Sequence, residues 1–118
     1  MDEKILKWLY DVQFAGQEIE GFFHQYEIMS ASDYSQNILL KKAVERNLEI
    51  IGEAINRIVK KDESFYDIIP ESRPIIGLRN VLIHAYDGIS DEMIWSVVTF
   101  HLPNLMRQVQ IIISNSNS

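Results

Sequence analysis

The stretch LLKKAVERNLEIIGEAINRIVKK, residues 39–61, decides the fold of this 118-residue chain. Its apolar residues come in adjacent pairs three or four positions apart, from Leu39/Leu40 to Ile58/Val59, with one polar member at Asn47, and this spacing is typical of a helix. The pairs make the apolar surface wider than the single stripe of a helix that packs on one neighbour. We therefore predict a long helix that buries two of its faces.

Gly52 lies in the middle of this helix, where glycine costs roughly 1 kcal/mol relative to alanine. The cost is explained if another helix crosses close to the backbone at this point, because glycine has no side chain to hold it away. We predict a helix crossing at Gly52.

Two further amphipathic helices are predicted from apolar residues that recur every three or four positions. The first covers about residues 2–24, with Asp2 as its N-cap. The second is shorter and covers about residues 72–85, where Pro74 suits the first turn. Polar, irregular connections are expected between the helices.

The last helix is predicted to begin at a Ser90 cap and to keep its apolar seam to Ile112. Pro103 lacks a backbone donor, so the helix should kink there. Residues 114–118 form a polar tail that is expected to fray. With no strand pattern or internal repeat, the chain is predicted to be all-α, an antiparallel bundle of the four-helix type in a single domain, residues 1–113.

Charge is unevenly distributed along this acidic chain, which has a formal net charge of -6. Residues 36–61 carry six basic and three acidic side chains, and Lys41, Lys42 and Arg46 are candidate contacts for RNA phosphates. The alternative is an ordinary solvated helix face.

Composition also excludes several classes of protein. The chain has no cysteine, so disulfides and thiolate metal sites are impossible. It has no apolar run of the roughly 20 residues that span a bilayer and no recognisable secretory signal, so a cytoplasmic protein without a membrane anchor is expected.

A possible catalytic motif lies in the sequence RNVLIHAY, residues 79–86. Arg79 offers a planar, permanent cation for a phosphate, and His84 can move a proton near neutral pH. On one straight helix the two side chains would lie about 140° apart and about 7.5 Å displaced along the axis. A two-fold partner could bring them around one cleft. Asn80, four residues before His84, could orient the imidazole or bind a phosphate oxygen.

Structural roles remain open for the same residues. Arg79 could pair with a carboxylate on a neighbouring helix, His84 could cap carbonyls at a helix end, and Tyr86 could simply pack at the surface. Glu49 and Glu53 could be carboxylates near a cleft, but ion pairs with Arg46 and Arg57 are the better expectation.

The remaining chemistry favours RNA cleavage without a metal. The three histidines are scattered, and no acidic cluster has metal-binding spacing, so neither a metal nor another cofactor is expected. RNA carries its own nucleophile, because a neutral histidine can take the proton of the 2′-hydroxyl that attacks the adjacent phosphate. Arginine can stabilise the charge that develops on the phosphorane oxygens.

The motif resembles the R-x(4)-H-x-Y signature of HEPN-domain ribonuclease toxins of the HepT type. The similarity covers about residues 3–112 and includes three other segments, RNLEIIGEA at 46–54, IGLRN at 76–80, and WSVV with HLPNL between 95 and 105. One departure is the segment before the motif, where the family often has Ile-Pro-Trp and this chain reads Ile69-Pro70-Glu71. The departure bears on the shape of this loop and on the docking of the protein that neutralises such toxins, not on Arg79 and His84.

The resemblance implies an all-α homodimer with metal-independent endoribonuclease activity on tRNA or mRNA. Arg79 and His84 would be the catalytic pair and Asn80 a supporting polar residue. It also implies a partner, a minimal nucleotidyltransferase antitoxin that neutralises the toxin by attaching AMP to Tyr86. The alternative is a helical partner or substrate-binding subunit of a nucleotidyltransferase, with no cleavage activity of its own.

Overall fold

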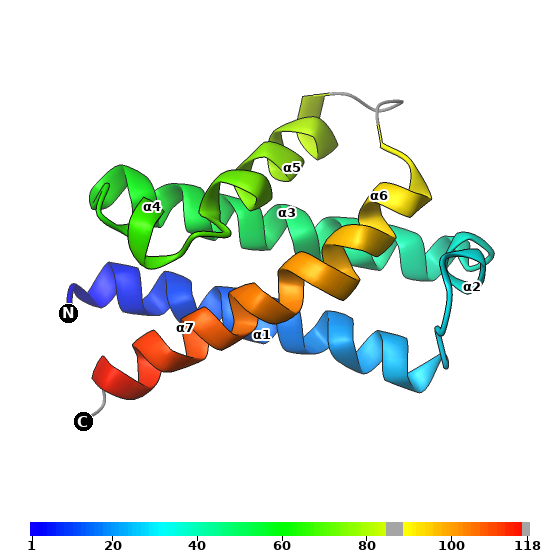
Figure 1. Ribbon diagram of the computed structural model, residues 1–118, viewed down its shortest axis with the longest axis horizontal. Coiled ribbons are helices and arrows are strands. Elements are labelled where there is room, and N and C mark those ends of the chain that lie inside the picture. The colour runs from blue at the N-terminus through cyan, green and yellow to red at the C-terminus, as the bar shows by residue number, and fades with distance from the viewer. Residues whose placement is uncertain (85–88, 117–118) are drawn as a thin grey trace.

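The long helix predicted from the central stretch is α3 (Ile38–Lys61). The computed structural model describes residues 1–84 and 89–116 (Figure 1). In these residues the chain is helical and forms no strand, which confirms the all-α prediction. None of the helices they form is long and apolar enough to cross a membrane.

Helix α3 buries two faces, as its paired apolar residues predict. One face packs along α1 (Glu3–Gln25), which runs antiparallel to it, and the other packs against α5 (Ser72–His84) (Figure 1). Its buried side chains occupy adjacent positions such as Leu48 and Asn47, or Ile58 and Val59. The wide apolar surface therefore serves two different neighbours.

Side-chain caps fix the helix ends that the sequence predicts. The Asp2 carboxylate accepts hydrogen bonds from the N–H groups of Lys4 (2.8 Å) and Ile5 (3.2 Å), and the Ser90 hydroxyl accepts one from Met93 (3.1 Å). These bonds satisfy backbone donors that a helix N-terminus leaves free. Both predicted caps are confirmed.

The connections are more ordered than expected. The polar stretch after α1 contains α2 (Ala31–Ser35), which starts with a reciprocal pair of bonds: the Ser30 hydroxyl accepts from the Asp33 N–H and the Asp33 carboxylate from the Met29 N–H. After α3 comes α4 (Phe65–Ile68), anchored by the buried Phe65. Each is one turn or little more, too short for apolar periodicity to reveal.

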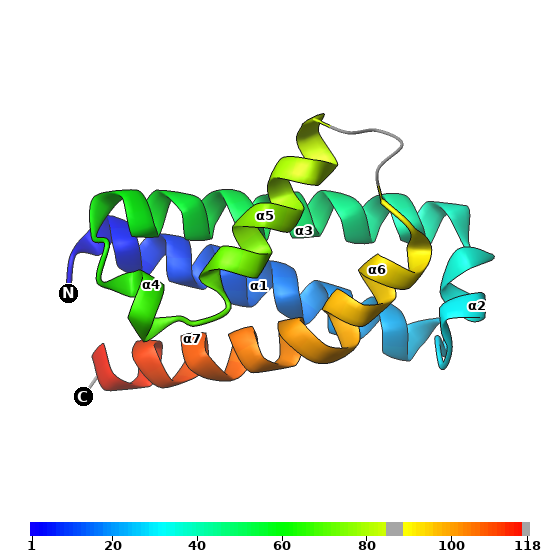
Figure 2. The same cartoon turned by 45° about the horizontal axis from the view of Figure 1, so that its top comes forward.

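The last helix consists of α6 (Asp91–Ser96), a π-helical turn, η1 (Val97–His101), and α7 (Leu102–Ser116). Within η1 the Leu102 N–H donates to the Val97 carbonyl, five residues back, just before Pro103. The wider turn lies where Pro103, which has no N–H to donate, interrupts the backbone hydrogen bonds of the helix, and Figure 2 shows the helix bending there. The predicted kink is therefore a π-helical turn. The helix also continues past Ile112 through Ser116, so residues 114–116 of the predicted polar tail are helical.

A polar contact ties the start of α5 to this turn. His101 Nδ1 lies 2.7 Å from Glu71 Oε2, and Glu71 directly precedes α5. Glu71 belongs to the segment in which this chain departs from the Ile-Pro-Trp pattern. From this end α5 passes over α3, and Figure 2 shows its C-terminal end rising away from the other helices.

The crossing of α5 over α3 takes place at Gly52, as predicted. A Cβ atom built on Gly52 would lie 2.3 Å from Arg79 Cβ and 3.3 Å from the Ile75 carbonyl oxygen, both on α5. These distances leave no room for a methyl group. Glycine at position 52 therefore sets how closely α5 approaches α3.

The Gly52→Ala variant should be less stable than the wild-type protein. Overpacking at this contact costs roughly 1–3 kcal/mol of stability, which exceeds the gain of about 1 kcal/mol in helix propensity from replacing glycine with alanine. A matched control is Gly77→Ala, because Gly77 is an exposed position of α5 whose added Cβ meets nothing within 4 Å. That variant should gain up to about 1 kcal/mol. Urea unfolding of both variants measures the contrast, and equal stabilities would show that the crossing is looser than described.

Candidate active site

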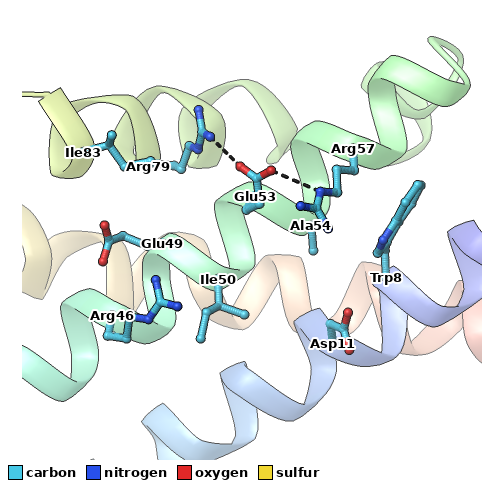
Figure 3. A pocket seen from close by; sticks show the side chains of 10 residues that line it. All are labelled: Trp8, Asp11, Arg46, Glu49, Ile50, Glu53, Ala54, Arg57, Arg79 and Ile83. Carbon is cyan, nitrogen blue, oxygen red and sulfur yellow. Dashed lines mark hydrogen bonds and ion pairs between the residues drawn. The ribbon is translucent and has the colours of Figure 1, made fainter.

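The close crossing at Gly52 brings Arg79 against α3. The Arg79 stem lies over Gly52, and its Nη2 forms an ion pair with Oε2 of Glu53, the next residue along α3. The same carboxylate accepts from Arg57 Nε at 3.1 Å through its other oxygen. Glu53 thus bridges two arginines, one from each helix (Figure 3).

The Arg79 guanidinium has one further partner in the described part of the chain. Its Nη1 donates to Asn80 Oδ1 at 2.9 Å. The Arg79 side chain is 21% exposed, and its Nε–H is buried and meets no acceptor among the described residues. Arg79 is therefore held on two sides while its side chain stays partly exposed.

An open cleft of about 450 Å³ lies beside this ion pair. Figure 3 shows its walls, which come from α1, α3 and α5. Three arginines, three acids, and apolar groups that include one tryptophan line it: Arg46, Arg57, Arg79, Asp11, Glu49, Glu53, Trp8, Ile50, Ala54 and Ile83. The equal number of cations and anions means that a polyanion would be bound by particular arginines and not by net charge.

His84 does not lie in this cleft. It is the last residue of α5, it is exposed, and it is not among the described residues that line the cleft beside Arg79. A five-residue step along one helix separates the two side chains by about 140°. A single chain therefore presents Arg79 and His84 on different sides of α5.

The other predicted site residues have these positions. Asn80 contacts Arg79, its neighbour in the chain, so its amide oxygen holds the guanidinium. Tyr86 lies outside the described residues. Among those residues, no group of three or more His, Cys, Asp or Glu side chains could hold a metal ion.

The three predicted RNA contacts are placed differently from one another. Lys41 forms an ion pair with Asp91 at 3.0 Å, and its side chain is only 26% exposed. Desolvation opposes the charge on Asp91, but hydrogen bonds from Lys41 and Ser35 outweigh it and lower the pKa of Asp91 below its usual value. Lys42 and Arg46 are exposed, and Arg46 lines the cleft. Lys41 is therefore already paired, whereas the other two can reach a ligand.

Glu53 is the residue of the site that the sequence identifies least well. Its spacing correctly predicts the ion pair with Arg57, four residues on, but not the pair with Arg79. Gly52 indicates where such a pair could form, because a helix that crosses at position 52 must also lie beside position 53. The ion pair with Glu53 confirms the structural alternative for Arg79, a pair with a carboxylate on a neighbouring helix.

Comparison with known proteins identifies relatives over most of the chain. The family described as ribonuclease HepT-like matches residues 15–112. A "putative RNase" of Caldanaerobacter subterraneus subsp. tengcongensis is 33% identical over 97 residues, 82% of this chain and 86% of the relative.

Two archaeal relatives agree with this match. A "putative RNase" of Methanocaldococcus jannaschii is 30% identical over 89% of this chain and 93% of its own length. A "probable ribonuclease HepT" of Thermococcus cleftensis is 33% identical over 83% of this chain and 86% of its own. No solved structure shows a significant match.

Proposed function

This chain belongs to the HepT-like ribonuclease family, and we propose that it is a metal-independent endoribonuclease in which Arg79 and His84 act on one phosphodiester. The observation that carries the proposal is how the Arg79 guanidinium is held. The ion pair with Glu53 and the hydrogen bond to Asn80 fix its guanidinium at the wall of an open cleft. A fixed cation at a solvent-accessible cleft is suited to a phosphate whose negative charge increases during reaction.

The reaction uses the 2′-hydroxyl of RNA as the nucleophile. Neutral His84 takes the hydroxyl proton, and the oxygen attacks the adjacent phosphorus. The bond to the 5′-oxygen of the next nucleotide breaks, that oxygen takes a proton from water, and the protonated His84 afterwards returns its proton to water. Arg79 stabilises the phosphorane oxygens. The products are a 2′,3′-cyclic phosphate end and a 5′-hydroxyl end, and no metal-bound water is required.

The active protein in this proposal is a homodimer. In one chain Arg79 faces the cleft beside α3, whereas His84 lies at the exposed end of α5. Two copies related by a two-fold axis would place both types of residue around a shared cleft. The dimer also explains how an acidic chain binds RNA, since it would gather two copies of the basic segment 36–61.

The biological role in this proposal is that of a cytoplasmic toxin acting on tRNA or mRNA. Its neutralising partner is a minimal nucleotidyltransferase antitoxin that transfers AMP to Tyr86. The support for the partner and for Tyr86 is the family resemblance of the motif at residues 79–86. The mass of the intact protein, co-expressed with such a nucleotidyltransferase, tests the transfer, and an unchanged mass would contradict it. Tyr86→Phe is the control.

Arg79→Ala and His84→Ala should each lose RNA cleavage. Removal of a general base lowers a rate by roughly 10²–10⁴-fold, and loss of a charge-stabilising donor has a similar effect. Cleavage of total tRNA in excess EDTA, with analysis of the product ends, measures both the activity and the cyclic phosphate. A matched control is His24→Ala, because His24 is an exposed histidine in the last turn of α1. This variant should cleave RNA at the wild-type rate. Full activity of His84→Ala would refute the assignment, as would a requirement for added metal.

Lys42→Ala should weaken RNA binding more than Lys41→Ala. Lys42 is exposed and free to contact a phosphate, whereas Lys41 is paired with Asp91. Loss of one phosphate contact should also make the slope of log K against log salt concentration less negative by about one. Binding of tRNA to the inactive His84→Ala protein, measured over a range of salt concentrations, provides the comparison. The assignment fails if the two lysine variants bind equally or if Lys41→Ala binds more weakly.

A further inference from the structure

Glu53 is the acidic group in direct contact with the arginine assigned to catalysis. Its Oε2 is paired with Arg79 Nη2 on α5, and its Oε1 with Arg57 Nε on its own helix. Each carboxylate oxygen is thus engaged by an arginine. Glu53 is therefore placed to hold both guanidinium groups.

The contacts of Arg79 determine which of its hydrogens can reach a phosphate. A guanidinium has five N–H donors in a fixed plane. Glu53 takes one on Nη2 and Asn80 takes one on Nη1. The Nε–H is buried without an acceptor in the described part of the chain. One hydrogen remains on each terminal nitrogen, so two donors are left for the oxygens of a phosphate.

The orientation of this pair depends on the ion pair with Glu53. The Arg79 stem is fixed where it passes over Gly52, but several torsions lie between Cβ and the guanidinium. Asn80 is exposed and adjacent in the chain, so its hydrogen bond constrains the plane less than an anchor on another helix does. Glu53 provides that second anchor from α3.

We propose that Glu53 is a positioning residue for RNA cleavage: it holds the Arg79 guanidinium so that its two free hydrogens face the phosphate. The inference rests on the function proposed above. It makes Glu53 act through Arg79 without touching the substrate. Its negative charge also opposes RNA binding, so loss of Glu53 should affect turnover and binding in opposite directions.

The test is a comparison of kcat and KM for cleavage of total tRNA. Glu53→Ala should lower kcat by about 10- to 100-fold, the effect expected when a catalytic group is misplaced. Its KM should stay the same or fall, because an anion has left the cleft. Glu53→Gln should give an intermediate kcat, since its amide oxygen can still accept from the guanidinium. A merely structural role would not separate kcat from KM in this way.

The matched control is Glu45→Gln, which removes the same charge from α3 outside the cleft. Burial raises the pKa of Glu45, so a neutral side chain is readily accepted there and cleavage should be unchanged. Circular dichroism establishes that each variant is folded. If Glu53→Ala does not fold, the isosteric Glu53→Gln decides the question.

The possible outcomes separate the inference from the function on which it rests. An unchanged kcat in folded Glu53→Ala overturns the inference. An increased kcat also overturns it, and would mean that Glu53 restrains Arg79. If the wild-type protein leaves tRNA intact while folded, the proposed function fails and the inference with it. A lower kcat with an unchanged or lower KM supports the positioning role.

Discussion

The close contact between Gly52 on α3 and Arg79 on α5 is the constraint on which the rest of the structure depends. A side chain at position 52 would collide with Arg79 Cβ, so α5 could not cross α3 at its present distance. The contact has two results. It closes one side of the core, and it places the Arg79 guanidinium beside Glu53 at the edge of the cleft. Packing and the candidate chemistry therefore depend on the same missing side chain.

Electrostatics explains how an acidic chain can still be suited to RNA. The cleft combines three arginines with three acids, so attraction for phosphate is local and depends on orientation. Glu53 reduces the net charge of the site but fixes the direction of Arg79. Lys41, by contrast, is bound to Asp91, the first residue of α6. Basic residues that are adjacent in the sequence thus differ in whether a carboxylate pairs with them.

The main helices could be predicted from the sequence because their signals are local. Apolar spacing defined α1, α3, α5 and the last helix, and Asp2 and Ser90 marked two of their starts. The short α2 and α4 were missed, since a helix of one turn has no periodicity. The effect of Pro103 was foreseen as a kink, but not its form, a π-helical turn at Val97–His101. For the site, the Gly52 crossing was predictable, whereas the Arg79–Glu53 pair follows from the depth and angle of that crossing. The assignment of Arg79 and His84 to catalysis stays a prediction.

The central claim is that Arg79, held beside α3, and His84, at the far end of α5, act together only when two chains share a cleft. The most direct measurement is RNA cleavage by a mixture of the two inactive variants, Arg79→Ala and His84→Ala, after joint refolding or co-expression. A mixed dimer keeps one arginine and one histidine, so cleavage should reappear in the mixture, although each variant alone is inactive. If the mixed dimer forms and still leaves RNA intact, the shared cleft is contradicted.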